Sequence, residues 1–96
     1  MIIVSQDKNI IYNYDKIECI FAVPDFEDFG KKIKWEIKAH LDSSKCYRLG
    51  VYKAEERAKE VLMEIADSYE YCQVLQEGHG LSLSSGYNYV YSMPKE

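Results

Sequence analysis

Leu49-Gly50-Val51-Tyr52 is followed directly by Lys53-Ala54-Glu55-Glu56-Arg57-Ala58-Lys59-Glu60-Val61-Leu62-Met63-Glu64-Ile65. The spacing of apolar residues changes across this junction, from every second residue to every third or fourth. A period of two is typical of a strand with one buried face, and a period of 3.6 is typical of an amphipathic helix. The stretch therefore predicts that a series of strands ends here and that a long helix begins.

The helix is expected over residues 54–75, with one apolar side and one acidic side. The apolar side consists of Ala58, Val61, Leu62, Ile65, Ala66, Tyr69 and Cys72. The acidic side carries Glu55, Glu56, Glu60, Glu64, Asp67 and Glu70. Ala54, at the expected N-cap, offers no side-chain acceptor to the first turn. The acidic side is either a solvated helix surface or a mimic of nucleic-acid phosphates that binds a basic cleft.

Short apolar runs separated by turns predict a β-meander over residues 1–52. Strands are expected at 2–5, 10–14, 17–23, 32–41 and 46–52. Pro24 should end the third strand, since proline cannot donate to a ladder, and should open a loop that reaches Gly30. Gly50, inside the fifth strand, predicts a bulge or a bend.

Strict alternation over residues 32–41 is the clearest strand pattern in the chain. One face holds Ile33, Trp35, Ile37, Ala39 and Leu41, and the other holds Lys32, Lys34, Glu36, Lys38 and His40. Such a pattern is typical of a strand with one buried and one solvated face. Its basic stripe is either ordinary solvated surface or an anion-binding surface.

After the helix, a glycine- and serine-rich loop is expected over 76–86, followed by a final strand over 87–93. The prediction is a single α+β domain over 1–96: an antiparallel meander sheet of five to six strands, packed against one long helix. Its core should contain Ile3, Ile11, Ile20, Trp35, Ile37, Leu49, Val61, Leu62, Ile65 and Tyr69.

The composition narrows the class of protein. The chain has 96 residues, 47% of them hydrophobic, and a formal net charge of −4. The negative charge argues against direct nucleic-acid binding, which needs a basic footprint. No apolar run approaches the ~20 residues of a membrane span, and Met1-Ile2-Ile3-Val4 is too short for a signal peptide. We therefore expect a cytoplasmic protein whose three cysteines, Cys19, Cys46 and Cys72, are buried free thiols.

The sequence contains no catalytic, cofactor-binding or metal-binding motif. His79 lies between two glycines without an orienting partner or nucleophile nearby in the sequence. His40 and Cys46 could meet across a turn, but His40 belongs to the polar face. The carboxylates between Pro24 and Gly30 do not follow a calcium-binding pattern. We expect a protein that is not an enzyme and that uses no cofactor or metal.

Two segments resemble a family of short uncharacterised proteins of Gram-positive bacteria and their phages and prophages. One comprises residues 1–8, Met1-Ile2-Ile3-Val4-Ser5-Gln6-Asp7-Lys8, with 12–17 nearby. The other comprises residues 49–62, and Met93-Pro94 also looks similar. The resemblance implies a small accessory protein of a phage or mobile element, and it carries no catalytic residues over.

Three functions follow as hypotheses. The first is a binding protein; its concrete form is a host-defence antagonist that blocks a nuclease or CRISPR-type channel with its acidic helix face. The second is sequestration of a small nucleotide: tyrosines would stack on the base and basic residues would meet the phosphate. Its candidate residues are Lys32, Lys34, Lys38, Arg48, His79, Tyr87, Tyr89 and Tyr91. The third is a ligand-free structural or regulatory subunit. Free strand edges favour a homodimer.

Overall fold

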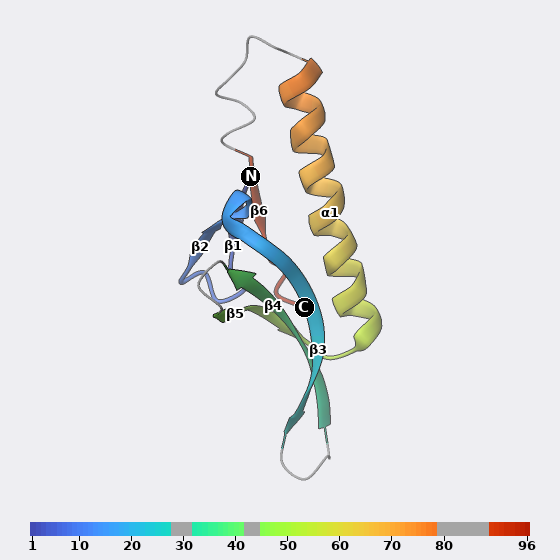
Figure 1. Cartoon of the computed structure of the whole chain (residues 1–96). Coiled ribbons are helices and arrows are strands. Elements are labelled where there is room, and N and C mark those ends of the chain that lie inside the picture. The colour runs from blue at the N-terminus through green and yellow to red at the C-terminus, as the bar shows by residue number, and fades with distance from the viewer. Residues whose placement is uncertain (28–31, 42–44, 79–88) are drawn as a thin grey trace.

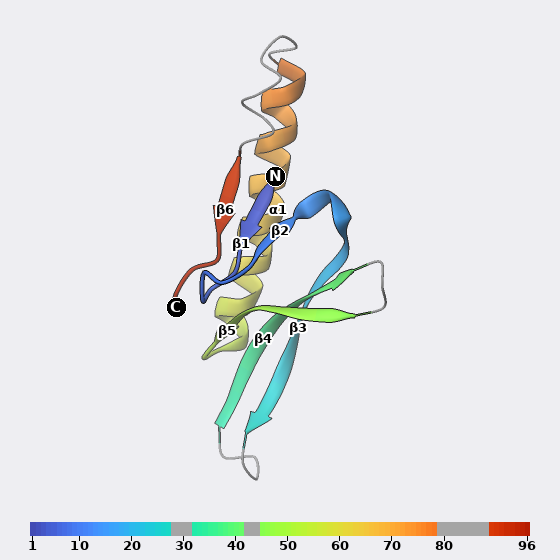
Figure 2. The ribbon, with the colours of Figure 1, turned by 90° about the vertical axis from the view of Figure 1, so that its left-hand side faces the viewer.

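Two small sheets and one long helix make up the protein. The computed structural model describes residues 1–27, 32–41, 45–78 and 89–96. Its elements are β1 (Ile2–Val4), β2 (Ile11–Asn13), the 3-10 helix η1 (Tyr14–Lys16), β3 (Ile17–Glu27), β4 (Lys32–Leu41), β5 (Cys46–Tyr52), α1 (Glu55–Gly78) and β6 (Val90–Ser92). Helix α1 runs along one side of the molecule, and both sheets lie on the same side of it (Figures 1 and 2). The fold class is α+β, as the sequence predicts.

The strands form two sheets, so the prediction of one meander sheet is wrong. Sheet A has the order β2-β1-β6, and sheet B has the order β3-β4-β5. The chain leaves sheet A at η1, where the Asn13 side chain accepts a hydrogen bond from the backbone N–H of Asp15 at 3.0 Å. This Asx turn redirects the backbone before β3 begins. Strand β6 then returns to pair with β1 in parallel, from Ile2↔Val90 to Val4↔Ser92.

Strand β3 continues through Pro24, which was expected to end it. Pro24 is the register partner of Trp35, and the strand reaches Glu27. Strand β3 lies at the edge of sheet B, where a proline can turn its missing N–H away from the ladder. The expected loop at 24–30 therefore begins later, and its residues 28–30 lie outside the described part of the chain.

The predicted bulge at Gly50 is confirmed. The β4–β5 register shifts there: Ile37 pairs with Gly50, whereas Lys38 pairs with Arg48. A Cβ on Gly50 would lie 3.0 Å from the hydroxyl oxygen of Tyr52 and 3.3 Å from the Cβ of Gln6. Glycine is needed because the backbone approaches these two side chains so closely.

The two sheets are joined by Gln6. Its backbone N–H donates to Leu49 O at 2.8 Å, and its side-chain Oε1 accepts from the Val51 N–H at 2.8 Å. Its Nε2 lies 3.0, 3.1 and 2.8 Å from the carbonyl oxygens of Val51, Pro94 and Lys95. The hydroxyl of Tyr52 also donates to Pro94 O, at 2.8 Å. This group, which we call the sheet junction, ties sheet A, the free edge of β5 and the C-terminal segment together.

The hydrophobic core lies between α1 and the inner faces of the sheets. Five of the ten expected core residues are buried: Ile3, Ile37, Leu49, Val61 and Ile65. Four more are partly buried and pack against the core, namely Ile20, Trp35, Leu62 and Tyr69. The helix was expected over 54–75 and runs from Glu55 to Gly78, with Ala58 and Cys72 also buried.

Three predictions of burial are wrong. Ile11 is 67% exposed, while Tyr12 beside it is 6% exposed and faces inward as the partner of Ile3. Glu36, placed on the solvated face, is buried, and Arg48 and Lys38 compensate its charge. Cys19 and Cys46 are exposed, so Cys72 alone among the three thiols is buried. A run such as Ile10-Ile11-Tyr12 contains no alternation that could have fixed the phase of β2.

Candidate binding face on the helix

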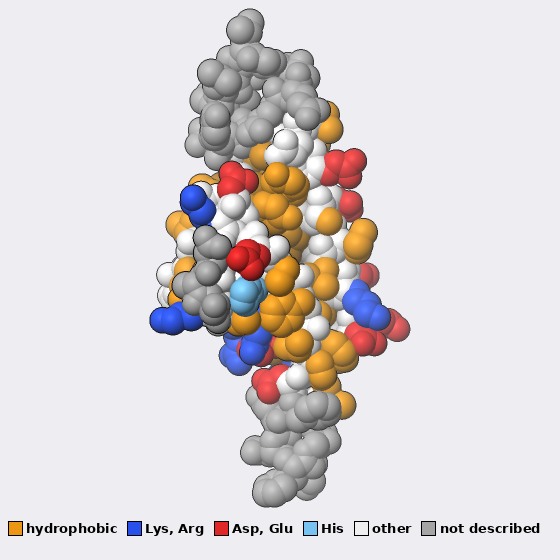
Figure 3. Space-filling view, in the orientation of Figure 1, with side chains coloured by type: hydrophobic (Ala, Val, Ile, Leu, Met, Phe, Trp, Pro, Cys, Tyr) orange, Lys and Arg blue, Asp and Glu red, His pale blue; other side chains and the backbone are white. Residues whose placement is uncertain are grey.

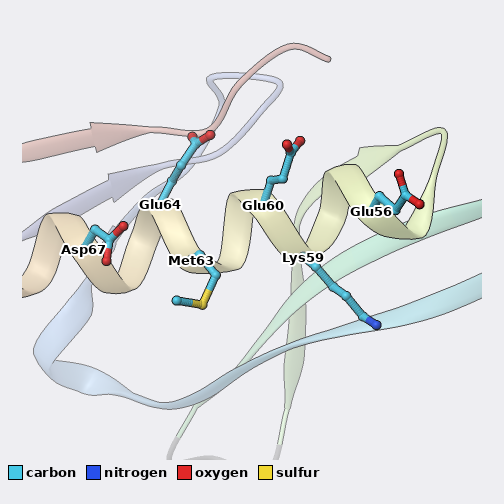
Figure 4. A pocket seen from close by; sticks show the side chains of 6 residues that line it. All are labelled: Glu56, Lys59, Glu60, Met63, Glu64 and Asp67. Atoms are coloured by element: carbon cyan, nitrogen blue, oxygen red, sulfur yellow. The ribbon is translucent and has the colours of Figure 1, made fainter.

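The outer side of α1 carries the acidic residues predicted from the sequence, and all six are exposed. Four of them, Glu56, Glu60, Glu64 and Asp67, line a shallow hollow together with Lys59 and Met63. Figure 4 shows Glu60 and Glu64 projecting to the same side of the helix, with Glu56 and Asp67 at the two ends. Steps of four residues along a helix correspond to about 6 Å. We call the six residues that line the hollow the acidic helix face, namely Glu56, Lys59, Glu60, Met63, Glu64 and Asp67.

Ion pairs neutralise part of this face. The Nη1 atom of Arg57 lies 3.4 Å from Oε1 of Glu60 and 3.2 Å from Oε2 of Glu64. The Nζ atom of Lys59 lies 3.8 Å from a carboxylate oxygen of Glu55. These pairs are exposed and each contributes little to stability. Glu56 and Asp67 have no ion pair within the described part of the chain, so their charges face solvent.

Met63 is the residue that the sequence reasoning missed. It is 61% exposed and lines the same hollow as the carboxylates, although Figure 4 shows that it points to the other side of the helix from Glu60 and Glu64. An exposed apolar side chain next to charged ones is common in protein interfaces, where methionine is enriched. The sequence could have indicated that Met63 is exposed, because it does not belong to the apolar stripe, whose members are three or four residues apart.

The charged face of α1 contrasts with the neighbouring surface. In Figure 3, acidic side chains gather along the outer edge of the molecule over α1, and apolar side chains form a band between α1 and β3. Sheet A has its own apolar surface, since Ile11 is 67% and Val90 50% exposed. The acidic helix face is therefore a distinct surface rather than part of a uniformly charged molecule.

The basic residues proposed for phosphate binding are engaged elsewhere. Arg48 donates through Nε to Glu36, and Lys38 Nζ lies 3.5 Å from the same carboxylate. Lys34 lies on the same strand, and it too has an interaction partner. Lys32 belongs to β4, but its side chain lies outside the described part of the chain. His79 and Tyr87 lie wholly outside it. No cluster of unpaired positive charge is present among the described residues of sheet B.

Tyr89 and Tyr91 pack against α1 and do not meet the lysines of sheet B. The ring of Tyr89 lies edge-on to that of Tyr71, with centroids 5.8 Å apart. The Tyr91 hydroxyl donates to Glu64 Oε1 at 2.8 Å. Burial and this hydrogen bond raise the pKa of Tyr91, and burial raises the pKa of Tyr52 to about 12. The stacking surface expected for a nucleotide does not form from these residues.

His40 and the two exposed cysteines share one row of sheet B. His40 is the register partner of Cys19 on one side and of Cys46 on the other. Its Nδ1 lies 3.2 Å from Oε2 of Glu18. The suggested approach of His40 and Cys46 across the turn is thus confirmed at the level of strand pairing. Within the described ranges, no three His, Cys, Asp or Glu side chains group closely enough to hold a metal ion.

Two further findings bear on the class of protein. Among the described residues, no helix combines the length and the apolar character that a membrane span requires. The chain matches no protein-family model, and comparisons with curated proteins and with solved structures gave no match.

Proposed function

We propose that this chain is a non-enzymatic binding protein that docks its acidic helix face onto a basic surface of a partner protein. One observation carries the proposal: four carboxylates line the same shallow hollow as the exposed side chain of Met63, and two of them, Glu56 and Asp67, have no ion pair within the described residues. Complementary charge guides association and fixes orientation, and the apolar centre contributes affinity when it is desolvated. All four carboxylate side chains are exposed, and those of Glu56 and Asp67 have no ion pair within the described residues, so these two are the most available to a partner.

The proposed partner is a basic nucleic-acid-binding protein of the host. The repeated negative charge along α1 resembles that of a nucleic-acid backbone and fits a channel lined by lysine and arginine. Together with the resemblance of residues 1–8 and 49–62, this supports an accessory protein of a phage or mobile element. Its action would be to occupy the nucleic-acid channel of a host-defence nuclease.

Site-specific photocrosslinking tests this function. Met63 is replaced by benzoylphenylalanine, and the matched control carries the same group at Val74, which is 57% exposed on the same helix. We expect position 63 to crosslink to a basic nucleic-acid-binding protein of the host, and position 74 not to. The double variant Glu56→Lys/Asp67→Lys should abolish the crosslink. Equal crosslinking from both positions, or none from position 63, would refute the proposal.

Self-association remains a separate prediction. The apolar surface of sheet A, with Ile11 and Val90 at its edge strands, would be the contact between two copies. Sedimentation equilibrium should then give a dimer for the natural chain and a monomer for Ile11→Lys. A monomeric natural chain at high concentration would contradict this prediction without affecting the helix-face proposal.

A further inference from the structure

A second hollow lies between the β1–β2 turn and β5, away from the acidic helix face. It is lined by Gln6, Asp7, Ile10 and Tyr12 from the first part of the chain and by Tyr47, Arg48 and residues 49–51 of β5. The volume is about 310 Å³, which is at the small end of the range for small-molecule sites.

Tyr12, one of the residues that line this hollow, has an unsatisfied hydroxyl. Tyr12 is 6% exposed, and its hydroxyl has no hydrogen-bond partner among the described residues. A buried polar group without a partner destabilises the fold, and such groups are rare. Burial, together with the nearby Asp7 and Tyr47, raises the pKa of Tyr12. The hydroxyl therefore stays protonated near neutral pH and can donate a hydrogen bond.

Flat and apolar side chains form the outer part of the hollow. The ring of Tyr47 lies 6.2 Å from that of Tyr12, measured between centroids, with an angle of 52° between the planes. Tyr47 is 36% and Ile10 43% exposed. The Tyr12 hydroxyl is buried, so a ligand reaches it only if side chains at the edge of the hollow, such as the partly exposed Tyr47, move. Such walls suit a planar ring that stacks on Tyr47.

Two charged residues determine which ring fits. Asp7 is exposed, and hydrogen bonds from Ser5 and from the backbone N–H of Asn9 lower its pKa, so it is an ionised acceptor. Arg48 donates through Nε to Glu36, which weakens it as a phosphate site. The hollow therefore favours an uncharged ligand with its own N–H or O–H donors over a phosphorylated one.

We propose that this hollow binds a nucleobase or nucleoside. The ring stacks on Tyr47, a ring nitrogen or carbonyl accepts the hydrogen bond of Tyr12, and an exocyclic amine or ribose hydroxyl donates to Asp7. The site differs from the tyrosine and lysine set expected from the sequence, since it uses Tyr12 and Tyr47 and excludes Tyr89 and Tyr91. It also functions independently of the acidic helix face.

Titration of the full chain with adenosine, guanosine, cytidine and uridine, followed by amide NMR shifts, tests the proposal. We expect at least one nucleoside to shift resonances of residues 6–12 and 47–51. Tyr12→Phe removes the hydroxyl alone. It should lower the affinity for that nucleoside about fivefold, which is a typical effect of one lost hydrogen bond. The same variant should melt at a higher temperature than the natural chain when no nucleoside is present. The matched control Tyr14→Phe, outside the hollow, should leave the affinity unchanged.

Two results would overturn the proposal. One is the absence of shifts in residues 6–12 and 47–51 at millimolar concentrations of all four nucleosides. The other is an affinity of Tyr12→Phe equal to that of the natural chain. The variant Glu56→Lys/Asp67→Lys should bind the nucleoside normally, so failure here and failure of the helix-face proposal are distinguishable.

Discussion

The sheet junction and the acidic helix face are both rich in polar groups, yet they use them in opposite ways. At the junction, the Gln6 side chain contacts four backbone groups, and the Tyr52 hydroxyl donates to one of them, the carbonyl oxygen of Pro94. On the helix, Glu56 and Asp67 face solvent. Paired and enclosed polar groups stabilise a fold, whereas exposed charges contribute little to stability and remain available for recognition. Substitutions in the two regions should therefore affect different measurements.

The junction joins three parts of the chain that lie far apart in the sequence. Gln6, residues 49–52 and the C-terminal segment at Pro94 and Lys95 meet there. The acidic helix face begins just after the second of these segments, at Glu56, and extends to Asp67.

The largest expected effect is that of Gln6→Ala. The substitution removes the amide that bridges β5 and the C-terminal segment, and should lower the free energy of unfolding by about 3 kcal/mol. Urea denaturation measures this difference. Gln73→Ala, on α1, is the matched control and should change stability by less than about 0.5 kcal/mol. Equal effects of the two substitutions would remove the distinction on which the comparison rests.

Gly50→Ala should lower the free energy of unfolding by about 2 kcal/mol, because the added Cβ would lie too close to the side chain of Tyr52. Removal of the Tyr52 hydroxyl relieves the closest of these contacts. In a double-mutant cycle, Tyr52→Phe should therefore be less damaging in the Gly50→Ala background than in the natural chain. Additive effects would show that the two residues do not press on each other.

Alkaline conditions should weaken the junction. Burial raises the pKa of Tyr52 to about 12 in the folded chain, from an ordinary value of 10.0. As the pH rises above 10, the unfolded chain loses this proton first, so stability is full below pH 10 and falls towards pH 12. The loss should be about 2 kcal/mol. Tyr52→Phe should flatten this part of the stability curve, and an unchanged slope would contradict the assignment.

The smallest effect on stability is expected for the thiols. Cys19 and Cys46 are exposed, while Cys72 is 1% exposed in the core. Ellman's reagent should therefore modify two thiols in the folded chain and the third only after unfolding, because access controls the reaction. Thermal melting should be nearly unchanged after the first two react. Modification of a single thiol in the folded state would show that the outer face of sheet B is covered.

Much of the fold could be predicted because periodicity records which side of an element is buried. The stripe of α1, the alternation around Ile37 and the bulge at Gly50 were all readable. Periodicity does not record which strands pair. The parallel return of β6 to β1, and the division into two sheets at η1, depend on contacts between residues far apart in the sequence.

The candidate site was predictable in the same partial way. Spacing placed the carboxylates on one side of a helix, but exposure was needed to distinguish Met63 from the buried stripe. The basic residues expected to meet phosphate show a different limit of the sequence. Glu36 was counted as part of a solvated face, whereas its burial draws Arg48 and Lys38 into ion pairs. A pattern of charges does not show which of them neutralise one another.

The most direct test of the central claim is calorimetric titration of the partner identified by crosslinking. The natural chain is compared with Glu56→Lys/Asp67→Lys and with Asp15→Lys/Glu18→Lys, which makes the same charge change away from the acidic helix face. We expect the helix variant to lose at least about tenfold in affinity, equivalent to about 1.4 kcal/mol, with stability nearly unchanged. The control should retain its affinity, and that affinity should fall with added salt. Equal affinities for the two variants would contradict the claim that this face is where the protein binds.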